Sequence, residues 1–404
     1  MKTIKLRFPN AEGQVLAARL ELPVDKQIKA YALFAHCFTC TKNLMAVTNI
    51  SRALTSKGIG VLRFDFTGLG ESEGDFADSN FSGNVQDLVC AADYLKDNYV
   101  APKVVIGHSL GGAAALMTAA KLDYIEAVAT VGAPSDVPHV QHLFQDSVEE
   151  INENGLANVM LGGRPFTIKK QFIDDLEQND LVSIIPKIRK PLLILHSPQD
   201  DTVDITNAEK IYHAAHHPKS YVSLDGADHL LTNKEDASYV GEVIASWAVR
   251  YLPKDAIDPL ETDHQVVVRN EADRGFLTEI MASGHYYIAD EPKSIGGTDL
   301  GGNPYDMLLS SLGACTAITI RMYAKHKGLP LQEVKVHMTR KKKHSVDAME
   351  LNANSMIEFI DREIELTGDL SQEQKERILE IGDKCPVHKT LSKGITINSM
   401  LKES

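Results

Sequence analysis

The chain has 404 residues, of which 43% are hydrophobic, and a formal net charge of −13 at pH 7. This length exceeds that of a typical single domain, so two domains are expected, and the apolar content suffices for a core in each. The negative charge argues against nucleic-acid binding and gives no basic face for an anionic membrane. Five cysteines do not indicate a secreted disulfide framework, which leaves reduced or redox-active thiols.

The amino-terminal residues Lys2–Arg7 alternate between polar and apolar, as in a strand, and no apolar leader follows them. No apolar run approaches the roughly 18 residues that span a bilayer. We therefore expect a cytoplasmic protein without a membrane partner. Up to about residue 250, predicted strands and helices alternate, which indicates a doubly wound α/β sheet.

A candidate nucleophile lies where an apolar strand meets a helix. The run Val104–Ile106 precedes the pentapeptide Gly107–Gly111, which has Ser109 at its centre, and an alanine-rich helical stretch follows. This is the context of the G-x-S-x-G nucleophile elbow. A serine hydroxyl needs a base within hydrogen-bond reach and N–H donors for the developing oxyanion. We predict that Ser109 is the nucleophile.

The acid and base partners of such a serine follow it in the order Asp or Glu, then His, at the ends of later strands. Asp200 follows the apolar run 191–195, and His229 follows the run 221–224. Asp200 would orient His229, which would take the Ser109 proton and return it to the leaving alcohol. The competing residues, which we expect to be solvated or outside the site, are Asp201, Asp204, Asp228, His213, His216 and His217.

Two backbone N–H groups would form the oxyanion hole. Leu110 follows the nucleophile and supplies one, and we assign the other to Phe38, in the turn His36–Phe38 after the apolar run 30–35. Together with the motif Phe64–Ser72, these motifs resemble α/β-hydrolase-fold esterases over about residues 1–250. Such enzymes usually carry glycine where this chain has Cys37. We expect a serine carboxylesterase that acts on short acyl esters.

Three of the five cysteines lie in this half. Cys37 and Cys40 form a C-x-x-C pair beside the oxyanion turn, and a disulfide there would distort the Phe38 donor and switch off the esterase. We expect inert thiols instead. Cys90 lies in an apolar helical stretch and is expected in the core. No run of cysteines, histidines or carboxylates has the spacing of metal ligands, so no metal or bound cofactor is expected.

Two segments interrupt the α/β alternation. About residues 134–186 contain polar helical pieces and the sequence Leu161-Gly162-Gly163-Arg164, and we expect a helical lid over the ester site. The stretch 252–259 carries two prolines and several charges, so residues 252–263 are the predicted linker between a domain at 1–251 and a second at 264–404.

The second domain has a different pattern. Strands are expected at 265–269, 275–282 and 285–289, followed by a long apolar helix at 304–327. Further strands at about 334–340 and 356–366, a helix from Ser371 and a closing strand complete it. The pattern predicts an α+β domain with an antiparallel sheet and one central helix.

Two cysteines of this domain stand out as a pair. Cys315 lies within the long helix, and Cys385 precedes Pro386, a favourable first helical residue, so its thiol would sit at a helix N-terminus that favours the thiolate. Alone, Cys315 would be a small buried hydrophobe. The Leu-Leu-x-Ser-Leu-x-x-Cys run, the later Cys-Pro-Val and the segment Gly296–Pro304 resemble the OsmC/Ohr family of thiol-dependent hydroperoxide reductases over about residues 264–404.

That resemblance implies a mechanism and an assembly. The Cys315 thiolate would attack the peroxide, Cys385 would resolve the sulfenic acid as a disulfide, and an external dithiol would reduce it. Family members form intertwined dimers, so a homodimer through this domain is expected. They also place a glutamate directly after Asn-Pro, where this chain has Tyr305 and Asp306. Arg274 or Arg269 would be the helper arginine of their first strands.

The whole chain thus resembles bifunctional hydrolase/OsmC fusion proteins, with small esters and organic hydroperoxides as substrates. Other functions fit the same residues. The triad also permits a thioesterase or a C–C hydrolase. The first half would alternatively bind small ligands without catalysis, and the second half would alternatively be only a dimerisation scaffold.

Overall fold

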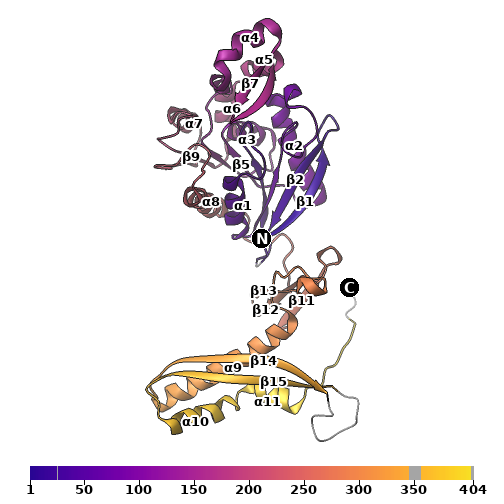
Figure 1. The fold of residues 1–404 in the computed structure, drawn as a ribbon, viewed down its shortest axis with the longest axis vertical. Helices are drawn as coiled ribbons and strands as arrows, with labels where there is room; N and C mark the ends of the chain where they lie inside the picture. The colour runs from indigo at the N-terminus through magenta and orange to yellow at the C-terminus, as the bar shows by residue number, and fades with distance from the viewer. Residues whose placement is uncertain (25, 345–355, 402–404) are drawn as a thin grey trace. The chain divides into compact units, whose positions relative to one another are not determined.

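The computed structural model describes residues 1–24, 26–344 and 356–401, and its chain divides into two compact units, Met1–Asp263 and His264–Ser404 (Figure 1). The division falls at the end of the predicted linker. Residues 252–263 contain no helix or strand, but they pack on the first unit, where the Ile257 N–H donates to the Ile28 carbonyl at 2.8 Å.

The first unit is built on an eight-stranded sheet with the order β1-β2-β4-β3-β5-β6-β9-β10. The β1–β2 and β2–β4 pairs are antiparallel and the others are parallel. The strands are β1 (Lys2–Pro9), β2 (Val15–Leu22), β3 (Ala30–Ala35), β4 (Ile59–Phe64), β5 (Val104–His108), β6 (Ala127–Val131), β9 (Leu192–His196) and β10 (Lys219–Ser223). Because the parallel strands share one direction, the turns that follow β3, β5, β9 and β10 meet at one edge of the sheet.

Helices cover both faces of this sheet, so the central strands are buried throughout and consist of apolar runs. Helices α1 (Met45–Thr55) and α8 (Lys234–Val249) pack on one face. Helices α2 (Phe81–Asn98), α3 (Leu110–Lys121) and α7 (Thr206–Ala214) pack on the other, beside the short helix η1 (Phe76–Asp78). The doubly wound fold predicted from the sequence is confirmed.

The insertion at residues 134–186 is helical for much of its length, but it also contains a hairpin that the sequence analysis missed. Its elements are η2 (Pro138–Ser147), α4 (Val148–Asn154), β7 (Leu156–Leu161), β8 (Arg164–Lys169), α5 (Lys170–Gln178) and α6 (Leu181–Ile188). Strands β7 and β8 pair antiparallel around Gly162 and Gly163, whose φ values are 55° and 76°. Glycine adopts this turn without strain, and a Gly-Gly pair between two short runs is a known hairpin pattern.

The second unit is an α+β arrangement, as predicted. Its elements are β11 (Val266–Asn270), η3 (Ala272–Arg274), β12 (Thr278–Ala282), β13 (His285–Ala289), η4 (Lys293–Ile295), α9 (Pro304–Lys327), β14 (Leu331–His344), β15 (Met356–Gly368), α10 (Gln372–Gly382) and α11 (Pro386–Lys393). Strands β11–β13 form one antiparallel sheet, and β14 and β15 form an antiparallel pair. A small core around Ile320 and Ile378 joins α9 to α10.

The prediction of a closing strand is wrong for the single chain. Residues 394–401 form no helix or strand, and Ile397, Met400 and Leu401 are exposed. Their apolar pattern joins no sheet edge among the described residues. The carboxy-terminal element that does form is the short helix α11.

Helix α9 is, within the described ranges, the one helix long and apolar enough to span a membrane. Length and apolar composition alone are weak evidence for a membrane span, because the central helix of a folded domain has them too. The helix begins in a capping box made by Asn303 and Asp306, and it packs against β14, α10 and α11. Asp306 therefore has a structural role at the helix start.

Candidate active site

Ser109 lies in the sharp turn between β5 and α3, with φ of 56° and ψ of −129°. This conformation is strained for a residue with a side chain, by roughly 1–3 kcal/mol, and such strain clusters at functional sites. Glycines allow the turn to form. A Cβ on Gly107 would lie 2.1 Å from the Gly111 carbonyl oxygen, and one on Gly111 would lie 2.3 Å from the His36 carbonyl oxygen. The elbow is therefore packed directly against the turn that follows β3.

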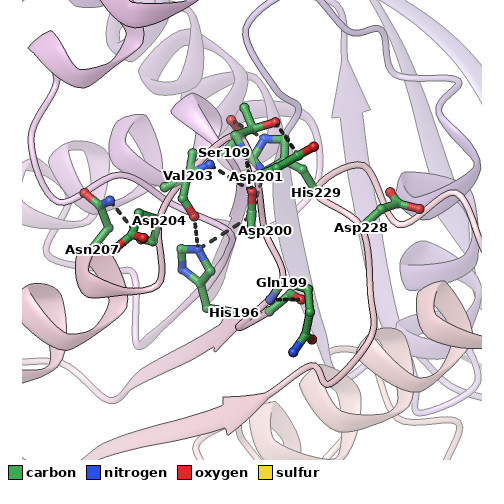
Figure 2. A network of polar contacts seen from close by, with 12 residues as sticks. Ser109, His196, Gln199, Asp200, Asp201, Val203, Asp204, Asn207, Asp228 and His229 are labelled. Atoms are coloured by element: carbon green, nitrogen blue, oxygen red, sulfur yellow. Dashed lines mark hydrogen bonds and ion pairs between the residues drawn. The ribbon is translucent and has the colours of Figure 1, made fainter.

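The predicted triad residues contact one another (Figure 2). His229 Nε2 lies 3.0 Å from Ser109 Oγ, and His229 Nδ1 lies 2.8 Å from Asp200 Oδ2. The Asp200 side chain is 2% exposed and that of His229 is 8% exposed. With the imidazole proton on Nδ1, the Nε2 lone pair faces the serine hydroxyl, which is the geometry for general-base catalysis.

The Asp200 carboxylate is held by several donors. Its Oδ1 accepts the N–H groups of Thr202 at 2.9 Å and Val203 at 2.8 Å, and its Oδ2 accepts from His229. Burial acts to raise the pKa of Asp200, but these hydrogen bonds and the nearby imidazole hold that pKa below its ordinary value. Asp200 is therefore ionised at neutral pH and orients the imidazole.

The competing residues lie elsewhere. Asp201 is exposed and approaches the Thr202 hydroxyl at 3.3 Å, and Asp204 caps the turn before α7 by accepting the Thr206 N–H at 2.9 Å. Asp228 organises its own loop by accepting N–H groups from Leu230 and Thr232. The three histidines of the α7 region, His213, His216 and His217, are exposed.

Two further histidines support the triad, and the sequence analysis did not identify them. His108 Nε2 lies 2.7 Å from the His229 carbonyl oxygen, and His196 Nε2 lies 2.7 Å from the Val203 carbonyl oxygen. Because a carbonyl oxygen only accepts, each Nε2 carries a proton. Burial lowers the pKa of His108 to about 3, and burial also lowers that of His196. Both are neutral donors that fix the backbone around Asp200 and His229.

The predicted oxyanion turn lies beside the elbow. Ala35 on β3 is in register with Gly107 on β5, and a Cβ on Gly111 would lie 2.3 Å from the His36 carbonyl oxygen, so the turn and the elbow are in contact. His36 Nδ1 donates to the Cys37 carbonyl at 2.8 Å, and Phe66 N–H donates to His36 Nε2 at 3.4 Å. A trans peptide places C=O and N–H on opposite sides, so this bond directs the Phe38 N–H away from His36. Burial lowers the pKa of His36 to about 4, which keeps the ring neutral.

A buried charge pair holds Lys42, which follows this turn in the chain. Asp65 Oδ1 accepts the Lys42 backbone N–H at 2.7 Å, and the Lys42 ammonium lies 2.5 Å from Asp65 Oδ2 and 2.6 Å from Glu71 Oε2. Lys42 and Asp65 are each 1% exposed, so neither charge could remain there without its partner. Asp65 and Glu71 belong to the motif 64–72, which thus holds the oxyanion turn in place.

Cys37, in this turn, and Cys40, just after it, are joined by a disulfide. The expectation of inert thiols is wrong in this structure. Cys90 lies on α2 and is only partly buried.

In the second unit, the predicted thiols lie where α9 meets α11. Cys385 is the N-cap of α11, is buried, and accepts the His388 N–H at 3.2 Å through its sulfur. The hydroxyl of Thr316, the neighbour of Cys315 on α9, lies 3.7 Å from the same sulfur. Cys315 itself is partly buried.

The arginines of this unit are arranged differently from the expectation. Arg269 and Arg274 both pair with Glu279 on β12, at 2.7 Å and 3.1 Å. Arg362 on β15, which the sequence analysis did not single out, donates to the Thr316 hydroxyl at 2.8 Å. Within the part of the chain that the structure describes, no group of three or more His, Cys, Asp or Glu side chains is placed to hold a metal ion.

Comparison with known families agrees with this architecture. The model of the alpha/beta hydrolase family matches residues 32–293, and the model of OsmC-like proteins matches residues 297–400. The chain belongs to the alpha/beta hydrolase family. More particularly, it is a fusion of an alpha/beta hydrolase domain with a carboxy-terminal OsmC-like domain.

Similar proteins cover the first unit. The esterase domain of a Rhodothermus marinus protein is 53% identical, with a TM-score of 0.53, over 62% of this chain and 99% of that one. Est1E from Butyrivibrio proteoclasticus, solved with ferulic acid, is 20% identical, with a TM-score of 0.52, over 61% and 98%. The uncharacterized protein YfhR of Salmonella typhimurium is 26% identical over 50% of this chain, and the match spans 65% of YfhR. Human palmitoyl-protein thioesterase ABHD10 is 26% identical over 37% of this chain and 49% of its own length.

The competition between Asp200 and its neighbour can be tested by neutralising each one. In Asp200→Asn the imidazole loses its anionic partner and favours the wrong tautomer, so kcat for hydrolysis should fall about 10⁴-fold. Asp201→Asn, at the exposed neighbouring position, is the matched control and should retain its kcat. Steady-state kinetics that rank the two variants in the opposite order would contradict the assignment.

Buried His108 should make the first unit sensitive to acid. The folded state keeps this ring neutral down to about pH 3, whereas the unfolded chain takes up the proton near pH 6.5. Its contribution to stability is complete above pH 6.5 and falls as the pH drops, by about 2 kcal/mol between pH 6.5 and 5. His108→Gln keeps a donor for the His229 carbonyl but has no titrating ring. Its free energy of unfolding should therefore fall by about 2 kcal/mol less than that of the wild type over the same pH range. Urea unfolding followed by fluorescence of Trp247 on α8, the one tryptophan, measures this, and equal losses would refute it.

Proposed function

We propose that the first unit is a serine carboxylesterase that hydrolyses short acyl esters through an acyl-enzyme on Ser109. The observation that carries the proposal is the continuous contact from Ser109 Oγ to His229 at 3.0 Å and from His229 to Asp200 at 2.8 Å. The 53% identity to an esterase domain over 99% of its length supports it.

Acylation begins when His229 Nε2 accepts the Ser109 proton as Oγ attacks the ester carbonyl. The imidazolium that forms is stabilised by the ionised Asp200. The carbonyl oxygen becomes negative and accepts the N–H groups of Leu110 and Phe38, which we assign as the oxyanion donors. Collapse of the tetrahedral intermediate expels the alcohol, which takes its proton from His229.

Deacylation repeats these steps with water. His229 removes a proton from the water that attacks the acyl carbon, the same two N–H groups hold the oxyanion, and Ser109 leaves with the proton from the imidazole. The enzyme returns to its starting state.

The surroundings of Phe38 support a short acyl group. Its ring packs against Phe76 and Phe172, with ring centroids 5.4 Å and 5.1 Å apart. Phe172 belongs to helix α5 of the insertion and is 2% exposed, so the insertion packs tightly over the residue that carries the oxyanion donor. We infer that this part of the chain acts as a lid that restricts long acyl chains.

A thioesterase is the second candidate, because part of the first unit resembles a palmitoyl-protein thioesterase. The triad serves either leaving group, since a thiolate leaves more easily than an alkoxide. The ratio of kcat/KM for matched acetyl and palmitoyl oxygen esters and thioesters distinguishes the two. A short-chain esterase has its highest kcat/KM with the acetyl oxygen ester, and a palmitoyl thioesterase has its highest with the palmitoyl thioester.

For the second unit, we propose a thiol-dependent reduction of organic hydroperoxides. The Cys315 thiolate attacks the peroxide, which releases an alcohol and leaves a sulfenic acid, and Cys385 displaces water from it to form a disulfide. An external dithiol then restores both thiols. The Arg362–Thr316–Cys385 contacts support this role, because they bring a cation close to the thiol pair through one hydroxyl.

We also propose that this unit forms a homodimer. Large apolar side chains remain exposed in the single chain, among them Ile318 at 60% and Met322 at 68% on α9. Val266 and Val268 on β11 are half exposed as well, beside the apolar carboxy-terminal residues described above. An uncovered set of this kind is typical of a subunit interface.

Replacement of the nucleophile tests the esterase. Ser109→Ala should reduce kcat/KM for p-nitrophenyl acetate by at least about 10³-fold, because the acyl-enzyme cannot form. The unfolding midpoint should stay close to that of the wild type, since the substitution removes one hydroxyl and leaves the backbone conformation as it is. Hydrolysis that survives in Ser109→Ala would refute the mechanism, and a wild type without hydrolysis would favour a ligand-binding function.

Replacement of Cys315 tests the second unit. Cys315→Ser should abolish consumption of an alkyl hydroperoxide in the presence of dihydrolipoamide, because serine cannot form the sulfenic acid. Cys90→Ser, which changes a thiol of the first unit, is the matched control and should leave peroxide consumption unaltered. Equal consumption by Cys315→Ser and wild type would reduce the second unit to a dimerisation scaffold.

A further inference from the structure

The Cys37–Cys40 disulfide is a feature that the proposed hydrolysis does not use. The two Cα atoms are 5.2 Å apart, and the Cys40 N–H also donates to the Cys37 carbonyl at 3.2 Å. The bridge closes a loop of four residues. Stabilisation by a disulfide grows with the length of the loop that it closes, so a bridge this short is a poor device for stabilising the whole fold. Its effect is confined to the conformation of residues 37–40.

That short loop holds two functional contacts. It carries the Phe38 N–H, which is one of the two proposed oxyanion donors. It also carries the Thr39 carbonyl, which accepts a hydrogen bond from the Arg164 guanidinium at the end of the β7–β8 hairpin. The disulfide therefore fixes both a donor of the active site and a contact between the oxyanion turn and the insertion.

The segments on either side of the loop are held by contacts that involve no sulfur. His36 Nδ1 bonds to the Cys37 carbonyl at 2.8 Å, and Asp65 accepts from both the backbone and the ammonium group of Lys42. The Asp65–Lys42 contacts do not depend on the sulfur–sulfur bond. The peptide that carries the Cys37 carbonyl and the Phe38 N–H, by contrast, would keep the His36 hydrogen bond but lose the bridge and the Cys40 N–H contact that the bridge holds in place. Opening the bridge should consequently loosen residues 38–40 while the fold around them persists.

The two sulfurs differ in accessibility. Cys37 is 4% exposed, whereas Cys40 is partly exposed, so Cys40 is the more accessible of the two to a small thiolate from solution. We infer that Cys37 and Cys40 form a thiol–disulfide site for small dithiols, and that the disulfide form is the active form of the esterase. The inference rests on the proposed esterase function, because hydrolysis is its readout.

Reduction of the bridge by thiol–disulfide exchange takes two steps. A thiolate of the dithiol attacks Cys40 Sγ, the Cys37–Cys40 bond breaks, and Cys37 leaves as a thiolate that takes up a proton. The second thiol of the reductant then displaces Cys40 from the mixed disulfide. The protein gains two thiols, and the dithiol becomes a cyclic disulfide.

The experiment compares the full-length protein before and after treatment with dithiothreitol. Alkylation and mass spectrometry of the peptide that contains residues 37–40 report the state of the pair, and p-nitrophenyl acetate reports kcat and KM. Complete loss of one oxyanion donor costs about 10²–10³-fold in kcat, so a loosened donor should cost about ten-fold, with KM changed less than two-fold. Reoxidation should restore kcat.

The variant Cys37→Ser/Cys40→Ser provides the second arm. It should hydrolyse at the lowered rate and should not respond to dithiothreitol. An unchanged or higher kcat in the reduced wild type would overturn the inference, as would a dithiothreitol effect that persists in the double variant. If the double variant fails to fold, the kcat values of the reduced and reoxidised wild type still test the inference. Hydrolysis that survives in Ser109→Ala would instead remove the esterase proposal.

Discussion

The close approach of three backbone segments at one edge of the sheet is the constraint on which the site depends. The elbow at Ser109, the turn after β3 and the segment after β6 meet at distances that leave no room for Cβ atoms. A Cβ on Gly111 would lie 2.3 Å from the His36 carbonyl oxygen, and one on Gly112 would lie 2.5 Å from the Cβ of Ala133, in the segment after β6. Because glycine occupies these positions, the strained Ser109 backbone can be held against its base and against the oxyanion turn.

Buried groups that do not touch a substrate keep this arrangement rigid. Neutral His108 and His196 donate to the backbone carbonyls of His229 and Val203, and neutral His36 fixes the Cys37 carbonyl. The Lys42–Asp65 pair then holds the other end of the oxyanion turn. Each is stable in the interior because it is either uncharged or fully paired. The electrostatic environment of the triad is thus set before a substrate arrives.

Much of this site could be predicted from the sequence, because its parts are local patterns joined by a simple rule. A strand, a glycine-flanked serine and a helix define the elbow, and the parallel sheet brings Asp200 and His229 to the same edge. The roles of His108 and His196 could not be predicted. A histidine after an apolar run looks the same whether it donates to a distant carbonyl or lies in solvent, and the partner is more than 100 residues away for His108.

The other misses have similar physical causes. The Cys37–Cys40 pair required knowledge of the turn geometry, and Arg362 reaches Thr316 only through the pairing of β15 with β14. The predicted closing strand has the right apolar pattern, but a strand forms only where an edge is offered to it. The hairpin of the insertion was the exception, since its Gly-Gly turn was visible in the sequence.

The two units carry separate proposed chemistries, and the assignment of Ser109 as an activated nucleophile is the central claim for the first. Treatment of the full-length protein with an alkyl fluorophosphonate, followed by intact-mass measurement and peptide mapping, tests that claim most directly. The account predicts one covalent adduct per chain, located on Ser109, because only a serine with a general base reacts at a useful rate. An ester-hydrolysing protein that carries no adduct on Ser109 would contradict it.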